Sequence, residues 1–250
     1  MRLLLVSDLH YTLRQLDWLI DAAQDADVVV LAGDHLDVAS SVPLDAQVAV
    51  IGRYLELLAG QATTVASSGN HDLTHRDADG EKAAPWLLDA RRHGVLVDGD
   101  SAEVGGALIT VCPWWDGPSQ RAALTRQLER DRDRSVRPWI WVYHWPPANS
   151  ATTWTGRSFY GDRDLSGWID QHGPDIVLCG HVHQPPFQPE GRWADRIGST
   201  WVFNAGQQVG PEPSHIVVDL DRGNATWRSL VGVEEQPLSD ASARPRALFQ

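Results

Sequence analysis

Five short motifs built from metal-ligand residue types occur in a fixed order along this chain. They are Asp-x-His at 8–10, Gly-Asp at 33–34, Gly-Asn-His-Asp at 69–72, a lone histidine at 144 and Gly-His-Val-His at 180–183. As candidate ligands they supply two carboxylates, one amide and four imidazoles: Asp8, His10, Asp34, Asn70, His144, His181 and His183. This set of oxygen and nitrogen donors suits a pair of divalent first-row transition metals, and it leaves His71 unassigned.

The spacing within the motifs predicts how their side chains face the metals. Asp8 and His10 are two residues apart after an apolar run. Alternation along a strand puts residues i and i+2 on the same side, so both can face one ion. His181 and His183 have the same spacing, and here the strand end can place one imidazole on each ion. The carboxylate of Asp34 has two oxygens and can bridge two ions, which a neutral imidazole cannot readily do.

Strands are predicted to position these motifs. Each motif follows, or nearly follows, a short β-branched or apolar run, so all five can gather at one edge of a sheet. The runs at 3–6 and 28–32 are continuous, as expected for strands covered on both faces. Residues 13–26 between them have apolar side chains at helical spacing, which predicts a strand–helix–strand unit with a right-handed crossover. A third strand, at 63–66, leads into the motif at 69–72.

The rest of the chain is richer in strands. Further helices are predicted at 48–58, 83–93, 119–134 and 164–172. Further strands are predicted at 95–97, 102–104, 108–112, 139–143, 176–179, 201–203, 216–220 and 225–230. This order predicts an α/β fold in which two mixed β-sheets pack together and are flanked by helices, a four-layer αββα sandwich. We expect residues 1–231 to form a single domain and the polar residues 232–250 to form a weakly ordered C-terminal tail.

Together the motifs resemble the signature of the calcineurin-like metallophosphoesterase superfamily, which reads D-x-H, G-D, G-N-H-D/E, a lone His and G-H-x-H. The resemblance extends over about residues 3–206. It implies a first metal held by Asp8, His10, Asp34 and His183, and a second held by Asp34, Asn70, His144 and His181. Asp34 is then the bridge between two divalent ions. Manganese or iron is expected, and zinc, cobalt and nickel suit the same ligands.

The resemblance also implies catalytic roles outside the ligand set. By similarity, His71 approaches the phosphoryl group and helps the leaving oxygen depart, as a general acid or as a charge stabiliser. Asp37 stands three residues after Asp34, where related phosphatases have the acid that orients this histidine. The serine/threonine protein phosphatases continue that motif as Asp-Arg-Gly, whereas this chain has Asp-Val-Ala at 37–39, which argues against a protein phosphatase. Asp37 is equally well placed to cap a turn.

The predicted activity is metal-dependent hydrolysis of phosphate esters. Two ions about 3.5–4 Å apart stabilise a bridging hydroxide, which would attack phosphorus in line with the leaving group. The intact pair His181 and His183, together with His71 and nearby aromatic loops, favours a small phosphodiester, nucleotide-derived compounds included. The alternatives are a phosphomonoesterase, a nuclease, and a catalytically silent scaffold of the same fold.

The composition of the chain limits the kinds of substrate and partner that we expect. The formal net charge of −12 repels a long polyanion, so we expect a small phosphorylated substrate and not long nucleic acid. No apolar run approaches the roughly 18 residues that span a bilayer, so no membrane partner is expected. The only cysteines, Cys112 and Cys179, adjoin predicted strands as buried thiols, which fits a reducing cytoplasm. The oligomeric state stays open.

Three long polar loops, at 74–85, 145–163 and 184–200, each follow one of the motifs. Such loops beside a catalytic centre usually control access and specificity. Tryptophans in loops near the motifs, at 114, 115, 145, 154 and 193, can stack on a base or simply anchor their loops. The candidate substrate-binding residues are His75, Trp114, Arg157 and Trp193.

Overall fold

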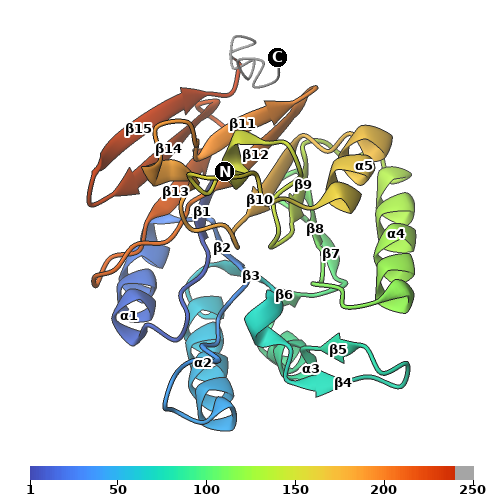
Figure 1. Ribbon diagram of the computed structural model, residues 1–250, viewed down its shortest axis with the longest axis vertical. Coiled ribbons are helices and arrows are strands. Elements are labelled where there is room, and N and C mark those ends of the chain that lie inside the picture. Colours follow the sequence, from blue (N-terminus) through green and yellow to red (C-terminus); the bar gives the residue numbers. More distant parts are fainter. Residues whose placement is uncertain (240–250) are drawn as a thin grey trace.

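Two β-sheets form the centre of the computed structural model, which describes residues 1–239 (Figure 1). The first sheet has seven strands in the order β15-β14-β13-β1-β2-β3-β6. The second has six strands in the order β11-β12-β10-β9-β8-β7. Both sheets are mixed, with a parallel group of strands beside antiparallel ones.

The parallel strands of the two sheets include every strand that precedes a motif. In the first sheet they are β1 (Arg2–Val6), β2 (Val28–Ala32), β3 (Thr63–Ser67) and β6 (Leu96–Val97). The antiparallel strands β13 (His215–Asp219), β14 (Asn224–Ser229) and β15 (Gly232–Pro237) extend that sheet beyond β1. In the second sheet the parallel strands are β8 (Ala107–Val111), β9 (Trp139–Val142), β10 (Ile176–Cys179) and β12 (Thr200–Asn204). Its antiparallel edge strands are β7 (Ser101–Val104) and β11 (Ala194–Ile197).

Helices cover the outer faces of both sheets (Figure 1). The first sheet is covered by α1 (Leu13–Ala22), α2 (Leu44–Ala59) and the short α3 (Pro85–Leu88). The second is covered by α4 (Pro118–Arg132) and α5 (Arg163–His172). Short 3-10 helices are η1 (Ala23–Asp25), η2 (Asn70–Asp72), η3 (Asp89–His93), η4 (Ala151–Thr153) and η5 (Pro185–Phe187). The predicted αββα sandwich is confirmed.

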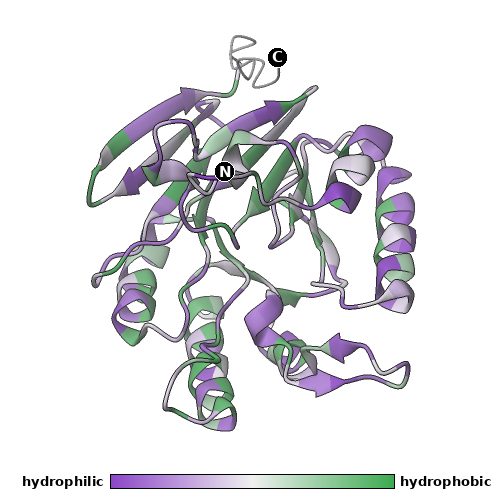
Figure 2. Ribbon diagram, viewed as in Figure 1, coloured by the Kyte–Doolittle hydropathy of each residue, from purple (hydrophilic) through white to green (hydrophobic). Residues whose placement is uncertain are grey.

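Strand β1 explains why the apolar runs are unbroken. Its alternating side chains serve two cores: Leu3 and Leu5 pack between the sheets, whereas Leu4 and Val6 pack under α1 and α2. Because both faces are covered, every position must be apolar. Each fully buried leucine contributes about 1.5–3 kcal/mol of hydrophobic free energy. Figure 2 shows the same distribution, with hydrophobic residues gathered in the central strands.

Several segments differ from the sequence prediction. The loop at 74–85 contains the small hairpin of β4 (His75–Arg76) and β5 (Lys82–Ala83), and the loop at 184–200 contains edge strand β11. The predicted helix at 13–26 ends at residue 22 and continues as η1. The predicted helix at 83–93 divides in the same way into α3 and η3.

The predicted start of the C-terminal tail at residue 232 is wrong. Residues 232–237 form strand β15, which pairs along its length with β14. This strand is mostly exposed and polar, since an edge strand needs only backbone pairing on one side, and so it lacks the apolar pattern used for prediction. Residues 240–250 of the predicted tail lie outside the described residues.

The structure also bears on the state of the two cysteines and on membrane-spanning helices. Cys112 and Cys179 are free and buried, as predicted. Within residues 1–239, no helix is both long and apolar enough to cross a membrane.

A candidate two-metal centre at the strand ends

The predicted ligands lie just beyond the carboxyl ends of the parallel strands. Four of them stand two residues past the end of a strand: Asp8 after β1, Asp34 after β2, His144 after β9 and His181 after β10. Asn70 follows β3 and begins η2. Parallel strands deliver their carboxyl ends to one edge, so two sheets packed face to face bring five separate segments together.

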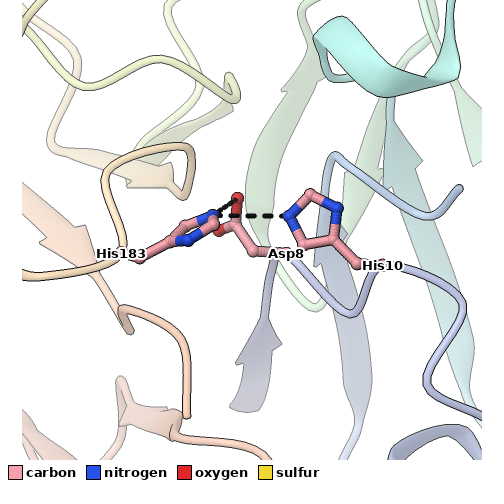
Figure 3. Close-up of side chains that lie close together, drawn as sticks. All are labelled: Asp8, His10 and His183. Atoms are coloured by element: carbon pink, nitrogen blue, oxygen red, sulfur yellow. Dashed lines mark hydrogen bonds and ion pairs between the residues drawn. The ribbon is translucent and has the colours of Figure 1, made fainter. Parts of the chain in front are cut away.

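One part of this cluster, which we term the His183 half, consists of Asp8, His10 and His183. The Nε2 atom of His183 lies 3.3 Å from an Asp8 carboxylate oxygen and 3.3 Å from Nε2 of His10. Figure 3 shows the two imidazoles pointing toward one another, with the Asp8 carboxylate beside His183. Two histidine nitrogens and a carboxylate therefore converge on one point, as a shared cation requires.

The other part, the His144 half, consists of Asp34, His144 and His181. Nε2 of His144 lies 3.2 Å from an Asp34 carboxylate oxygen. That same oxygen is 3.8 Å from Nε2 of His10 in the His183 half. Asp34 thus stands between the two halves, where a bridging carboxylate is expected.

Buried polar atoms in the cluster fit bound metal ions. In the part of the chain that the structure describes, Oδ1 of Asn70 and Nε2 of His181 are buried and have no hydrogen-bond partner. A buried polar atom without a partner lowers the stability of the fold by about 1–3 kcal/mol, so a bound ligand at these atoms is expected. Oxygen and imidazole donors are what divalent transition metals accept. The residues therefore fit a two-metal site, and His181 is grouped with Asp34 and His144 in the His144 half.

The backbone at the cluster is held in a conformation that side chains rarely adopt. Asp8, His10, Asp34 and His181 have φ angles of 56°, 42°, 53° and 66°. Such left-handed residues cost roughly 1 kcal/mol or more each and persist where surrounding contacts enforce them, often at functional sites. Here the N–H groups of Asp8 and His10 donate to the carbonyls of Gly33 and Asp34, at 3.1 and 3.0 Å. The N–H of His181 donates to the Asp8 carboxylate at 3.0 Å.

Two motif glycines are required by close packing against the ligands. A Cβ atom on Gly69 would lie 2.2 Å from an Asp34 carboxylate oxygen, and one on Gly33 would lie 2.3 Å from Nδ1 of His144. Both distances are far inside van der Waals contact, so any side chain at either position would displace a ligand. Gly33 also has a φ of +85°, which favours glycine.

Charge and burial act against each other within the cluster. Burial alone would raise the pKa of Asp34, but the adjacent His144 lowers that pKa well below its ordinary value. Burial opposes protonation of His144, yet the neighbouring carboxylates of Asp34 and Asp8 raise its pKa to about 9. Burial, reinforced by the positive charge of His144, lowers the pKa of His181 to about 3. A metal ion in the His144 half would therefore compete with a proton on His144.

Asp72 joins the loops that follow β2 and β3. Its buried carboxylate accepts three backbone N–H groups, those of Gly69 (2.8 Å), His35 (3.0 Å) and Leu36 (3.0 Å). Asp72 therefore fixes the loop that carries the Gly-Asn-His-Asp motif. The contacts hold the segments of Asp34 and Asn70 against each other.

Other contacts orient individual ligands from behind. Nδ1 of His144 lies 2.6 Å from the carbonyl oxygen of Ala32, which leaves Nε2 facing the site. The side-chain amide of Gln207 donates to the carbonyl oxygen of Asp8 at 3.0 Å. Gln207 is far from Asp8 in the sequence, and no motif predicts this contact.

Comparison with known proteins agrees with this geometry. Residues 1–185 match the family model described as calcineurin-like phosphoesterase. The chain belongs to the calcineurin-like phosphoesterase family. No curated protein sequence matches it significantly.

Solved structures share the fold of this calcineurin-like phosphoesterase at low sequence identity. TT1561 of Thermus thermophilus is 18% identical, with a TM-score of 0.59 over 95% of this chain and 98% of its own. Purple acid phosphatase PPD1 from yellow lupin (Lupinus luteus) seeds is 14% identical, with a TM-score of 0.55 over 98% of this chain and 52% of its own. The protein is thus a metallophosphoesterase with candidate aspartate and histidine metal sites, arranged as a two-metal centre.

His71 lies beside the ligands of this phosphoesterase. Its ring meets the ring of His10 edge-on, with centroids 4.6 Å apart, and its backbone N–H donates to Asp34 at 2.9 Å. Its Nδ1 is buried and has no hydrogen-bond partner among residues 1–239. The imidazole therefore lies beside the candidate ligands, and within residues 1–239 no hydrogen bond occupies its Nδ1.

Within residues 1–239, Asp37 forms no hydrogen bond or ion pair with His71, the residue that the resemblance implies it orients. Its carboxylate accepts the N–H of Ala39 at 2.8 Å, and its backbone exchanges hydrogen bonds with the side chain of Gln47. It therefore caps a turn, which is the alternative that the sequence left open. The orienting role toward His71 stays a prediction.

The candidate substrate-binding residues separate into different locations. Trp114 lies against the ligands, with ring centroids 5.8 Å from His144 and 5.2 Å from His181. His75 and Arg157 are exposed, and in the described chain neither forms a hydrogen bond, ion pair or ring contact with the ligands. The structure thus brings Trp114 to the centre and leaves the other two at the surface.

Trp193 is predicted to bind substrate, but the structure places it in the core between the sheets. It is only 5% exposed, its ring stacks near Phe203, and its indole N–H donates to Glu234 at 2.8 Å. A tryptophan in a loop beside a motif can point inward as easily as toward the site, and the sequence does not distinguish the two.

Two further aromatic residues, Trp145 and Tyr160, contact His181. Their ring centroids lie 5.3 and 5.5 Å from that of His181. Trp145 was among the tryptophans that the sequence left open, but Tyr160 was not identified. The only signal for it was its place in the loop at 145–163, which starts directly after His144.

Proposed function

We propose that this protein hydrolyses a small phosphodiester at the two-metal centre. The observation that supports this most directly is the position of Asp34, which belongs to the His144 half and lies 3.8 Å from His10 of the His183 half. The ring centroids of His71 and His10 are 4.6 Å apart. Two cation sites joined by one carboxylate, with an additional imidazole alongside, suit transfer of a phosphoryl group to water. Manganese or iron is the expected metal, since the donors are oxygen and imidazole nitrogen.

Aromatic side chains beside the ligands favour a diester over a monoester. The rings that contact His181 are those of Trp114, Trp145 and Tyr160. A dianionic monoester is best recognised by guanidinium or ammonium groups. A diester carries one negative charge fewer and a second organic arm, which aromatic surfaces can contact. The acidic net charge of −12 disfavours a long polyanion.

Different residues of this chain would have different roles in catalysis. Asp8, His10 and His183 would hold one ion, Asn70, His144 and His181 the other, and Asp34 both. When bound, such ions supply a water nucleophile at neutral pH and neutralise charge on the phosphoryl oxygens. His71 would give a proton, or a hydrogen bond, to the leaving oxygen. The hydrogen bond from the His71 N–H to Asp34 ties that imidazole to the bridging position.

Hydrolysis by protein loaded with Mn²⁺ tests the proposal. The substrates are ethyl p-nitrophenyl phosphate (a diester), p-nitrophenyl phosphate (a monoester) and single-stranded DNA. We expect kcat/KM to be highest for the diester and lowest for DNA. If protein with two bound metal equivalents hydrolysed none of them, the proposed reaction would be wrong; a faster monoester reaction would overturn only the diester preference.

A further inference from the structure

Three aromatic residues line one side of the ligand cluster, and we term them the aromatic wall: Trp114, Trp145 and Tyr160. Their ring centroids lie 5.2, 5.3 and 5.5 Å from that of His181. They come from two segments that follow different strands, β8 and β9. Their convergence on one metal ligand is therefore a product of the tertiary fold.

The wall is fixed in place before any ligand binds. The rings of Trp114 and Trp145 stack at 5.4 Å with only 12° between their planes. The backbone N–H of Trp114 donates to Ser68 at 3.0 Å, and the indole N–H of Trp145 donates to the carbonyl of Tyr160 at 3.2 Å. Fixed rings lose little conformational entropy on binding, which favours recognition by stacking.

Part of the wall remains accessible. Tyr160 is 52% exposed although its ring stacks over His181 at 28°. Trp114 and Trp145 are half-buried. Core packing therefore accounts for only part of these rings, and the remaining surface lies directly beside a metal ligand.

The wall and His71 contact different ligands of the cluster. The wall contacts His181 and, through Trp114, His144. His71 instead contacts His10 and Asp34. If the leaving group departs beside His71, the wall faces the ester arm that stays on phosphorus.

Ring geometry favours a planar arm over a cationic one. An aromatic cage for an ammonium group needs ring faces set around one point. Trp114 and Trp145 are instead nearly parallel, which suits addition of another flat ring. Stacking of this kind tolerates any base or aryl group, because each has a π face.

We propose that the aromatic wall is a specificity subsite that selects a planar aromatic group, a nucleobase or an aryl ring, on the retained arm of the substrate. This rests on the proposed function, in that the metal centre holds the phosphoryl group. Trp114 and Tyr160 would be the specificity-determining residues.

Binding of phosphonates tests the wall independently of turnover, because their P–C bond is not hydrolysed. The probes are phenylphosphonate, methylphosphonate and 2-aminoethylphosphonate, titrated calorimetrically into Mn²⁺-loaded protein. We expect phenylphosphonate to bind about 10-fold more tightly than methylphosphonate, the size of effect expected from stacking one ring. Tyr160→Leu and Trp114→Leu should each remove most of that advantage.

Trp154→Leu is the matched control. Trp154 lies in the same loop as Tyr160, but its ring packs on Phe159 at 4.9 Å and, in the described chain, makes no ring contact with the ligands. This variant should keep the full preference for phenylphosphonate. Three results would overturn the proposal. They are equal affinity for phenylphosphonate and methylphosphonate, higher affinity for 2-aminoethylphosphonate than for phenylphosphonate, and a preference for phenylphosphonate that persists in both Tyr160→Leu and Trp114→Leu.

A pair of esters with the same leaving group separates the two proposals. Phenyl and ethyl p-nitrophenyl phosphate differ only in the retained arm. If both esters are hydrolysed at equal kcat/KM and phenylphosphonate binds no more tightly than methylphosphonate, the proposed hydrolysis is supported and the proposed aromatic subsite is wrong. If instead phenylphosphonate binds more tightly, the wall substitutions abolish this difference, and neither ester is hydrolysed, the aromatic subsite is supported and the proposed hydrolysis is wrong.

Discussion

The two halves of the metal centre differ in what surrounds them. In the His183 half, the His183 side chain is 32% exposed and the neighbours are polar, among them His71 and Gln207. In the His144 half, the His144 side chain is 0% exposed and the neighbours are aromatic. The contrast fits the proposed roles, with acid–base chemistry beside His71 and substrate recognition beside the aromatic wall. Three substitutions test these proposed roles, in order of expected effect, and a fourth tests a buried histidine outside the centre.

Asp34→Asn should have the largest effect, because the Asp34 carboxylate belongs to the His144 half and lies 3.8 Å from His10 of the His183 half. An amide has only one oxygen and no charge, so it cannot bridge two cations. We expect the affinity for both ions to fall by more than the about 10- to 100-fold lost when an outer partner of a ligand is removed, and activity to fall with it. Elemental analysis after gel filtration gives the metal content. Retention of two equivalents by the variant would show that Asp34 is not the bridge.

His71→Ala should separate chemistry from metal binding. We expect turnover to fall by about 10²–10⁴-fold, the usual contribution of an acid–base group, while the metal content stays unchanged. His75→Ala is a matched control, since His75 is an exposed histidine four residues later. The control should have wild-type kcat. Full activity of His71→Ala on a diester with a poor leaving group would remove His71 from the mechanism.

Gln207→Leu should affect the His183 half alone. The substitution removes the hydrogen bond to the Asp8 carbonyl, which is 3.0 Å long. One such bond contributes about 1 kcal/mol, so the affinity for one of the two ions should fall about fivefold. Titration calorimetry with Mn²⁺ resolves the two sites. The neighbour Gln208, whose side chain contacts Glu212 and Leu230, provides the control Gln208→Leu. Equal weakening of both sites would contradict an effect restricted to one half.

His215→Phe addresses a buried histidine outside the centre and should have the smallest effect. Burial lowers the pKa of His215, with Arg228 adding to that effect and Glu212 and the Pro213 carbonyl opposing it. Since the unfolded chain takes up a proton near pH 6.5 and the folded one at lower pH, stability is lost as the pH falls below that value. In chelator-treated protein, the melting temperature of the variant should therefore fall less than that of wild type between pH 7 and 5. Identical losses would mean that acid sensitivity arises elsewhere, including at the centre.

The structure agrees with the sequence where the signal was local. Strands β1, β2 and β10 were predicted because their side chains are buried on both faces, which makes an unbroken apolar run. Strands β11 and β15 were not predicted. They are polar edge strands whose stability comes from backbone pairing with β12 and β14, and such pairing has no residue pattern of its own.

The same limit applies to the candidate site residues. Trp114 and Trp193 are both tryptophans in loops near motifs, yet one lies against His181 and the other packs between the sheets. Asp37 has the spacing of an orienting acid but caps its own turn. In each case a neighbour from outside the motif decides the role, and a single sequence does not specify that neighbour.

By itself, the sequence determined the candidate donors and their order, because each motif is a short segment that follows a strand of apolar residues. It also determined that these donors stand at strand ends, and hence the reaction class that their resemblance implies. Only the tertiary structure decided which aromatic rings cover one half of the cluster and which side chains outside the motifs hold the ligands. Those contacts join loops of different strands across two sheets, so they depend on how the sheets pack and not on any local pattern of residues.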